Sequence, residues 1–281
     1  MRQTPDGDWR VQETDLPSTG SAPAGSQVDH ILPRGVLSRF AATASHGRLW
    51  RKTDFEHSHI FSPPTGAETE AGSIPESFWT CVWNCPHALP PNLPPVGSFS
   101  GDIRRPVARL YERMGSNTNL TPLVVLEGGI NGSKGCLESL RQPITNAKSQ
   151  KKVGQAIANT GASPEEFLKH LRWAVGVFEY LRSPEIVRRR GDIVDGISSD
   201  LKLIEQHTEH SKGLAAIWDQ FHPSYFAQAS RLARDWVMNW VNCTKAKYCK
   251  AESPPPNRDY VLSELGKIEK KIDMMRYPFE D

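Results

Sequence analysis

The sequence predicts a mainly α-helical domain that contains an irregular segment rich in aromatic residues and proline, and at most a small β element. Two stretches of the second half begin with Ser-Pro-Glu and continue with apolar residues at helical spacing. A third stretch, 213–241, carries many aromatic residues at the same spacing. Serine followed by proline and an acidic residue is a typical helix start, and a single apolar stripe predicts a helix that buries one face.

The first 26 residues differ in composition from the rest of the chain. Residues 1–26 are rich in Ser, Thr, Gly, Pro and Asp and have few large apolar side chains. Such a composition cannot offset the entropy cost of ordering, so we predict a disordered leader. We expect residues 27–281 to form one helical domain, although the sequence allows a subdivision near residue 160. Its first helix is expected after Pro33, where apolar residues recur at helical spacing. These residues are Val36, Leu37, Phe40 and Ala44.

The next hundred residues are less regular. The stretch Thr53–Gly101 alternates aromatic clusters with proline and glycine, which predicts an ordered segment without regular structure. Asp102 is expected to cap the helix that follows. The run 123–126 of aliphatic and β-branched residues predicts a lone strand, and the glycine-rich run 128–135 predicts a tight turn after it. This run lacks the ending of a phosphate-binding loop, because no Ser or Thr follows Lys134.

Two helices are expected within residues 163–207. Ser163 and Pro164, followed by two glutamates, predict the start of the first helix. Ser183 and Pro184, again followed by glutamate, predict the start of the second. Because only a short turn joins them, we expect the two helices to form an antiparallel hairpin.

The remaining elements complete a helical body. The aromatic stretch 213–241 predicts a long helix that packs against this hairpin, and Pro223 is the place where it could be interrupted. A proline-rich connector at 253–257 follows. Apolar residues between Val261 and Ile272 then predict a final amphipathic helix. The lysines outside its apolar stripe fit a solvated helix face as well as they fit a basic patch.

Composition and charge restrict the partners. The formal net charge of +2 is far from strongly basic, which argues against a nucleic-acid partner. No apolar run approaches the roughly 20 residues of a membrane span, and the polar N-terminal start lacks the apolar core of a signal peptide. We therefore expect no membrane partner and a chain that is either cytosolic or a piece of a longer precursor. Because five cysteines are an odd number, at least one stays outside any set of internal disulfides.

Several blocks of the sequence carry a family resemblance through their order and spacing. They are DHILPRGVLSRFAATASHGRL at 29–49, ALPPNLPPVG at 88–97, LYERMGSNTN at 110–119, FEYLRSPE at 178–185, and LIEQHTEHSKGLAAIWDQFHPSYF at 203–226. Together they resemble the accessory region that follows the catalytic domain in fungal killer-toxin-like chitinases of class V, glycoside hydrolase family 18. The resemblance covers most of residues 28–275. It implies a helical module of unknown biochemical role, attached in its relatives to secreted enzymes with chitin-binding modules.

The catalytic motif of those chitinases is absent. In the motif DxxDxDxE the glutamate donates a proton and the aspartates orient the N-acetyl group of the substrate. The closest string here contains Asp192 and Asp195, but Ile197 and Ser199 occupy the positions of the last aspartate and the glutamate. We therefore expect a non-catalytic interaction module that binds a protein or carbohydrate partner.

Two alternative functions remain open. Asp29 is followed by His30, and a carboxylate can fix the tautomer of an imidazole, so the pair could act as the general base of a toxin-like hydrolase or nuclease. The same two residues could instead be structural, with Asp29 as a helix cap and His30 at a half-buried site. The second alternative is a chitin-binding or other carbohydrate-binding module, because exposed tryptophans stack on sugar rings. Its candidate residues are Trp50, Trp79 and Trp83.

No metal and no cofactor are predicted. Three pairs of residues offer ligand atoms, but none has the spacing of a standard zinc site. His87 lies near Cys85 in the sequence, whereas no third ligand can be identified for His207 and His210. The pairs are His57 and His59, Cys81 and Cys85, and His207 and His210.

Overall fold

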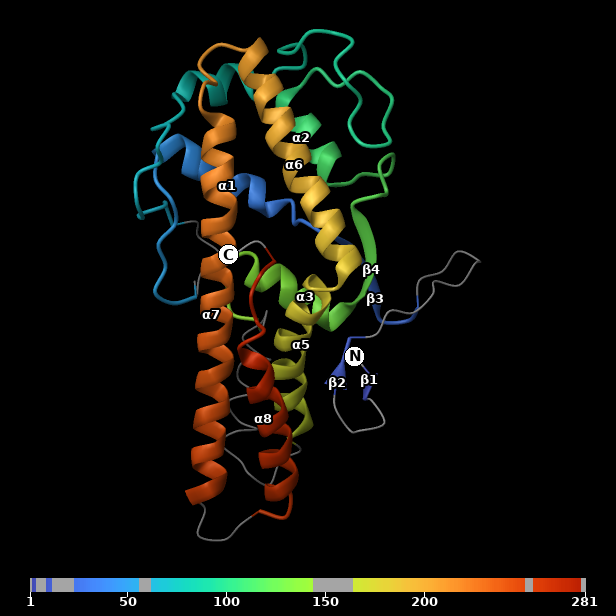
Figure 1. Cartoon of the computed structure of the whole chain (residues 1–281), viewed down its shortest axis with the longest axis vertical. Coiled ribbons are helices and arrows are strands. Elements are labelled where there is room, and N and C mark those ends of the chain that lie inside the picture. The colour runs from blue at the N-terminus through green and yellow to red at the C-terminus, as the bar shows by residue number, and fades with distance from the viewer. Residues whose placement is uncertain are drawn as a thin grey trace.

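A computed structural model of the chain confirms the mainly helical fold class (Figure 1). The structure describes residues 2–3, 9–11, 23–55, 62–143, 164–250 and 255–278. Within these ranges its α-helices are α1 (Gly35–His46), α2 (Pro106–Met114), α3 (Gly128–Leu137), α5 (Glu165–Leu181), α6 (Pro184–His207), α7 (Leu214–Lys250) and α8 (Arg258–Ile272). The described residues also form a short π-helix, η1 (Phe78–Val82), and four strands. The strands are β1 (Arg2–Gln3), β2 (Trp9–Arg10), β3 (Ser26–His30) and β4 (Leu123–Glu127).

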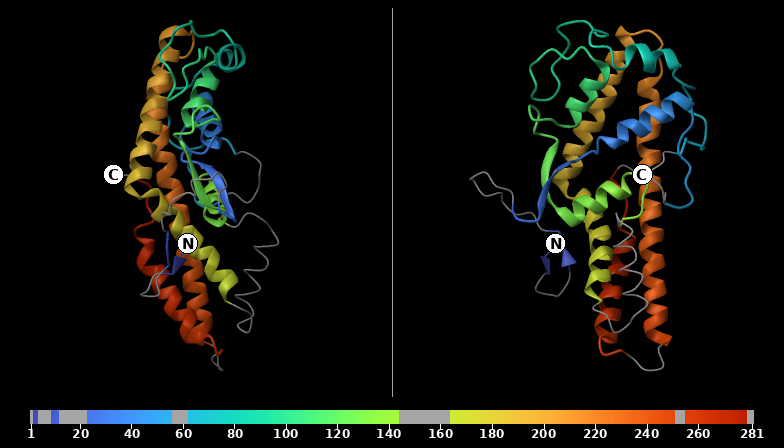
Figure 2. Two further views of the ribbon diagram at one scale, coloured as in Figure 1. Left: turned by 90° about the vertical axis from the view of Figure 1, so that its right-hand side faces the viewer. Right: turned by 180° about the vertical axis from the view of Figure 1, so that it is seen from behind.

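The long helix α7 packs against α1, α3, α5, α6 and α8, whereas α2 packs against α6. It runs along most of the molecule, with α6 antiparallel to its first half and with α5 and α8 beside its second half (Figures 1 and 2). Its aromatic residues are core residues, because Trp218 is completely buried and meets Phe40 of α1 edge to face at 5.3 Å. Pro223 lies inside α7 without ending it, so the helix is longer and more continuous than the sequence suggested.

The expected antiparallel hairpin of α5 and α6 is wrong. The two helices follow one another along the long axis in the same general direction, and the antiparallel neighbour of α6 is α7 (Figures 1 and 2). Only Arg182 and Ser183 separate them, and Arg182 keeps dihedral angles close to the helical region. Because only Ser183 is extended, the link bends the chain without reversing it. Pro184 does begin α6, but the Ser183 side chain makes no capping hydrogen bond.

Two further expectations on local structure are corrected. The helix α2 begins at Pro106, with Arg105 rather than Asp102 at its N-cap. The strand β4 is present, but the glycine-rich run after it forms helix α3 instead of a tight turn. The glycines serve close packing here: a Cβ on Gly129 would come within 2.0 Å of the indole of Trp173 on α5. Tertiary packing against α5 therefore overrides the low helix propensity of glycine.

The strands β3 and β4 form a two-stranded antiparallel ribbon that lies against α3, with Asp29 opposite Val124. The described part of the predicted leader consists of residues 2–3, 9–11 and 23–26, which contribute β1, β2 and the start of β3. The rest of that leader lies outside the described residues, as do residues 253 and 254 of the connector and the stretch around residue 160. The division into a leader and one domain therefore stays a prediction.

Candidate functional site

The structure places Asp29 and His30 on β3, with their side chains on opposite faces of the ribbon. Asp29 is buried, and its carboxylate lies 2.9 Å from the Nζ of Lys134. The Nδ1 of His30 lies 3.0 Å from the carbonyl oxygen of Met114. Neither residue caps a helix. Each side chain has its own separate partner, and the hydrolase hypothesis stays a prediction.

Asp29 belongs to a buried charge cluster, which we define as Asp29, Lys134, Glu138 and Arg190. The Nζ of Lys134 donates to the carbonyl oxygen of His30 at 2.7 Å and lies 3.2 Å from the Glu138 carboxylate. Arg190 donates to the same carboxylate at 2.8 Å. Lys134 and Arg190 are 1% and 0% exposed, so two acids and two bases neutralise one another away from water.

The surroundings of the buried charge cluster show that it joins several elements. The guanidinium of Arg190 lies over the ring of Phe226 at 4.2 Å and over that of Tyr277 at 5.0 Å. The Tyr225 hydroxyl donates to the carbonyl oxygen of Glu138 at 3.1 Å. Burial raises the pKa of the Asp29 carboxyl, although Lys134 opposes this effect. The cluster therefore connects β3, α3, α6 and α7 with the C-terminal residues. These contacts indicate that it stabilises the fold.

His222 on α7 packs beside this cluster, between the rings of Trp218 and Phe226. It is 5% exposed, and its Nε2 has no hydrogen-bond partner among the described residues. Burial and, to a smaller extent, the positive charge of Arg190 together lower the pKa of His222 to about 3. The folded protein therefore holds a neutral imidazole at this position.

We expect acidification from about pH 7 to about pH 5 to destabilise the protein through His222. In the unfolded chain the imidazole has a pKa of 6.5 and is protonated at pH 5. In the folded protein it stays neutral until about pH 3. The neutral His222 side chain makes its full contribution to the free energy of unfolding above pH 6.5. This contribution is lost as the pH falls, by about 2 kcal/mol at pH 5. Urea unfolding of the wild type and of His222→Phe at both pH values measures this. An equal loss in the two proteins would contradict the expectation.

The candidate sugar-binding tryptophans pack against protein. Trp50 and Trp83 are 3% and 8% exposed, which leaves little ring surface for a sugar. The half-buried Trp79 donates its indole N–H to the carbonyl oxygen of Ile74 at 3.2 Å and meets Trp83 edge to face at 5.1 Å. Carbohydrate binding stays a prediction, with Trp79 as the candidate whose ring is accessible in part.

The described residues also hold no group of three or more His, Cys, Asp or Glu side chains that could bind a metal ion. His57 and His59 lie outside those residues. The five cysteines are free thiols. Among the described helices none is both long and apolar enough to cross a membrane.

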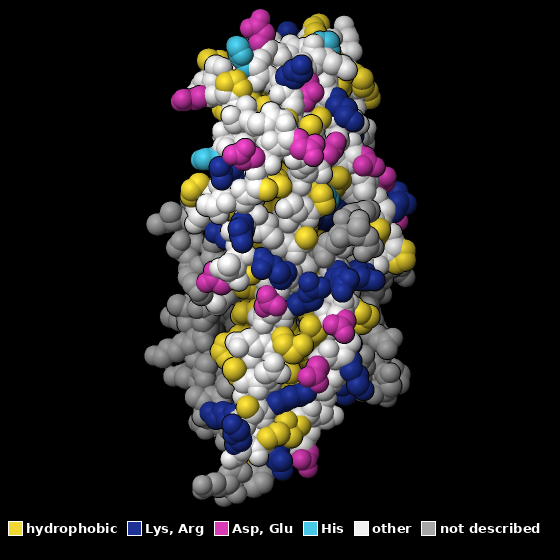
Figure 3. Space-filling model, turned by 60° about the vertical axis from the view of Figure 1, so that its left-hand side comes forward, with side chains coloured by type: hydrophobic (Ala, Val, Ile, Leu, Met, Phe, Trp, Pro, Cys, Tyr) yellow, Lys and Arg dark blue, Asp and Glu magenta, His cyan; other side chains and the backbone are white. Residues whose placement is uncertain are grey.

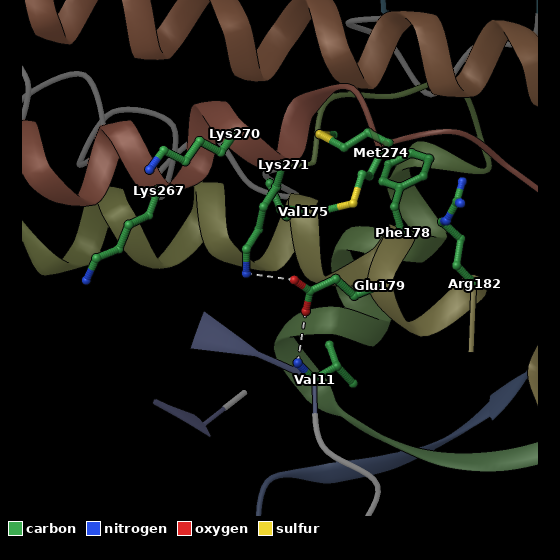
Figure 4. Close-up of a pocket in the computed structure, with 10 residues that line it drawn as sticks. Val11, Val175, Phe178, Glu179, Arg182, Lys267, Lys270, Lys271 and Met274 are labelled. Carbon is green, nitrogen blue, oxygen red and sulfur yellow. Dashed lines mark hydrogen bonds and ion pairs between the residues drawn. The ribbon is translucent and has the colours of Figure 1, made fainter. Parts of the chain in front are cut away.

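A groove along the seam of α5 and α8 is the candidate functional site (Figure 4). Its volume is about 670 Å³. Both helices and the segment after β2 contribute to its wall, so residues far apart in the sequence meet there. Its apolar lining consists of Val11, Val175, Phe178, Met274 and Met275. Its charged lining consists of Glu179, Arg182, Lys267, Lys270 and Lys271. We call these ten residues the α5–α8 groove.

The electrostatics of the α5–α8 groove are strongly asymmetric, with four cations and one carboxylate. Glu179 uses both of its oxygens, since Oε1 accepts from Lys271 at 2.8 Å and Oε2 accepts from the backbone N–H of Val11 at 2.9 Å. Lys267 donates to Glu264 at 2.7 Å. Neither Arg182 nor Lys270 has an ion-pair partner among the described residues, so within that part of the chain two cations of the groove are not ion-paired. Figure 3 shows one face of the molecule, on which Lys and Arg side chains gather midway along its length.

Sequence reasoning missed this groove, although part of its signal was present. One helical face carries Lys267, then Lys270 or Lys271, and then Met274. From the sequence, its lysines fit a solvated face as well as they fit a basic patch. That face borders α5 in the structure, and Arg182 at the end of α5 extends its positive charge. The sequence could not show this because it does not say which helix packs beside α8.

Comparison with known proteins gives no relative: no family model, no curated protein and no solved structure matches this chain.

Proposed function

We propose that this chain is a non-catalytic interaction module that binds an anionic partner in the α5–α8 groove. The observation that carries the proposal is the combination of an apolar lining with four cations and one carboxylate, where two of the cations have no ion-pair partner among the described residues. Binding sites for small molecules commonly combine an apolar wall with a few oriented polar groups. The ion pair between Asp29 and Lys134 supports binding rather than catalysis, because it occupies the carboxylate that a general base would need.

The relation to the accessory region of killer-toxin-like chitinases is part of this proposal. Phe178, Glu179 and Arg182 of the groove belong to FEYLRSPE, one of the blocks that carry the resemblance. We therefore extend the proposal to that accessory region: it would contribute a binding function beside the catalytic domain, through the same seam of helices.

A neutral apolar dye tests whether the groove binds at all. We expect Nile red to bind the wild-type protein saturably, and Met274→Asp to weaken it about fivefold, because Met274 is the exposed apolar residue of the groove wall. Met238→Asp is the matched control, since Met238 is also partly exposed but lies on α7 outside the groove. Equal affinity in all three proteins, or no saturable binding, would refute the proposal.

Two assays address the alternative functions directly. Turnover of RNA, DNA or a chitin oligosaccharide that is lost in His30→Ala would replace the binding proposal with the hydrolase. Retention on chitin that is lost in Trp79→Ala would replace it with carbohydrate binding. We expect neither result.

A further inference from the structure

We infer that the ligand of the α5–α8 groove is a long-chain carboxylate, a slender alkyl chain with one terminal acid group. This inference rests on the proposed function and adds the class of ligand to it. The shape of the groove, the distribution of its unpaired charges and the chemistry of its apolar wall each support this class.

The shape favours a slender ligand over a protein surface. A volume of about 670 Å³ lies in the range of pockets that enclose small molecules. Val175, Phe178 and Met275 line the inner wall and are at most 3% exposed, so that wall is recessed. A broad partner surface would touch only the rim, whereas an alkyl chain can lie along the seam. Met274, which is 49% exposed, is flexible enough to pack over such a chain.

The charges favour a single acidic head group. Lys267 is ion-paired with Glu264, and Lys271 is ion-paired with Glu179. Arg182 and Lys270 are therefore the cations of the groove that can bind a ligand. Glu179 makes no ion pair with Arg182; its two oxygens accept from Lys271 and from the backbone N–H of Val11. A guanidinium binds a carboxylate through two parallel hydrogen bonds, which makes Arg182 the expected anchor. A cationic head group would be repelled at the same place.

Three probes with the same chain and different head groups test the ligand class. We expect isothermal titration calorimetry to show dodecanoate binding at least about tenfold more tightly than dodecanol, and no binding of dodecyltrimethylammonium. We also expect dodecanoate to displace Nile red. Equal affinities for dodecanoate and dodecanol would overturn the ligand class while the Nile red result kept the proposed function intact. Absence of Nile red binding would overturn both.

Charge-removing variants locate the head group. The double variant Arg182→Gln with Lys270→Gln should lose about tenfold in dodecanoate affinity and nothing in dodecanol affinity. The control Lys202→Gln with Lys212→Gln removes the same charge from exposed positions outside the groove and should bind like the wild type. Equal losses in both double variants would overturn the inference. A groove filled by a second copy of the chain, seen as a dimer in sedimentation that Met274→Asp dissociates, would overturn it as well.

Discussion

Replacing Lys134 by methionine should lower the free energy of unfolding by about 3–5 kcal/mol, because it removes one partner from a buried set of ion pairs. Lys134 contacts two carboxylates, those of Asp29 and Glu138, and also donates to a backbone carbonyl. Without it, two buried acids face Arg190 alone, and one negative charge stays uncompensated. Methionine has a similar length, so little packing is lost. Urea unfolding at neutral pH measures the change.

A second substitution separates charge from packing. Asp29→Asn in the Lys134→Met background removes the surplus negative charge and leaves Glu138 paired with Arg190. We expect the double variant to regain part of the lost stability, since residues that share an ion pair are not additive. The exposed Lys202→Met should change stability by less than about 0.5 kcal/mol. If the losses in the free energy of unfolding at Asp29 and Lys134 were strictly additive, this would contradict the coupling of the two residues in the cluster.

Local sequence signals predicted the helices well where a start signal and an apolar stripe coincided. Pro184 begins α6, a helix follows Pro33, and the final helix covers Val261 to Ile272. These predictions succeed because proline position and side-chain periodicity act within one helix. The direction of one helix relative to the next depends on the joining residues and on distant packing, which is why the hairpin of α5 and α6 was wrong.

The buried charge cluster could not be read from the sequence. Lys134 lies in a glycine-rich run that by itself favours a turn, and its partner Asp29 is 105 residues away. The run becomes helical because Gly129 leaves room for the indole of Trp173 and because Lys134 forms ion pairs with buried carboxylates. Similarly, Trp50 and Trp83 lie in an irregular stretch, where composition alone does not distinguish a buried ring from an exposed one.

Replacing Asp200 by asparagine should cost about 3 kcal/mol, through a second buried ion-pair network that attaches α2 to α6. Asp200 accepts from Arg109 at 2.8 Å and from Arg113 at 3.0 Å, and it is 1% exposed. Arg109 is also buried and donates to the carbonyl oxygen of Pro94, so the same network holds the irregular segment before α2. Asparagine keeps the shape of the side chain but leaves both guanidinium groups without an anion. Urea unfolding gives the total loss, and hydrogen exchange should show faster exchange in α2.

The matched control for this prediction lies on the same helix. Asp192 pairs with Arg188 at 3.0 Å, but both side chains are more than half exposed. Asp192→Asn therefore removes an equivalent charge and an equivalent ion pair where water screens both, and it should cost at most about 0.5 kcal/mol. An equal loss in the free energy of unfolding for the two substitutions would show that burial does not strengthen the Asp200 network. A large loss at Asp200 alone would show that α2 depends on this carboxylate for its attachment to α6.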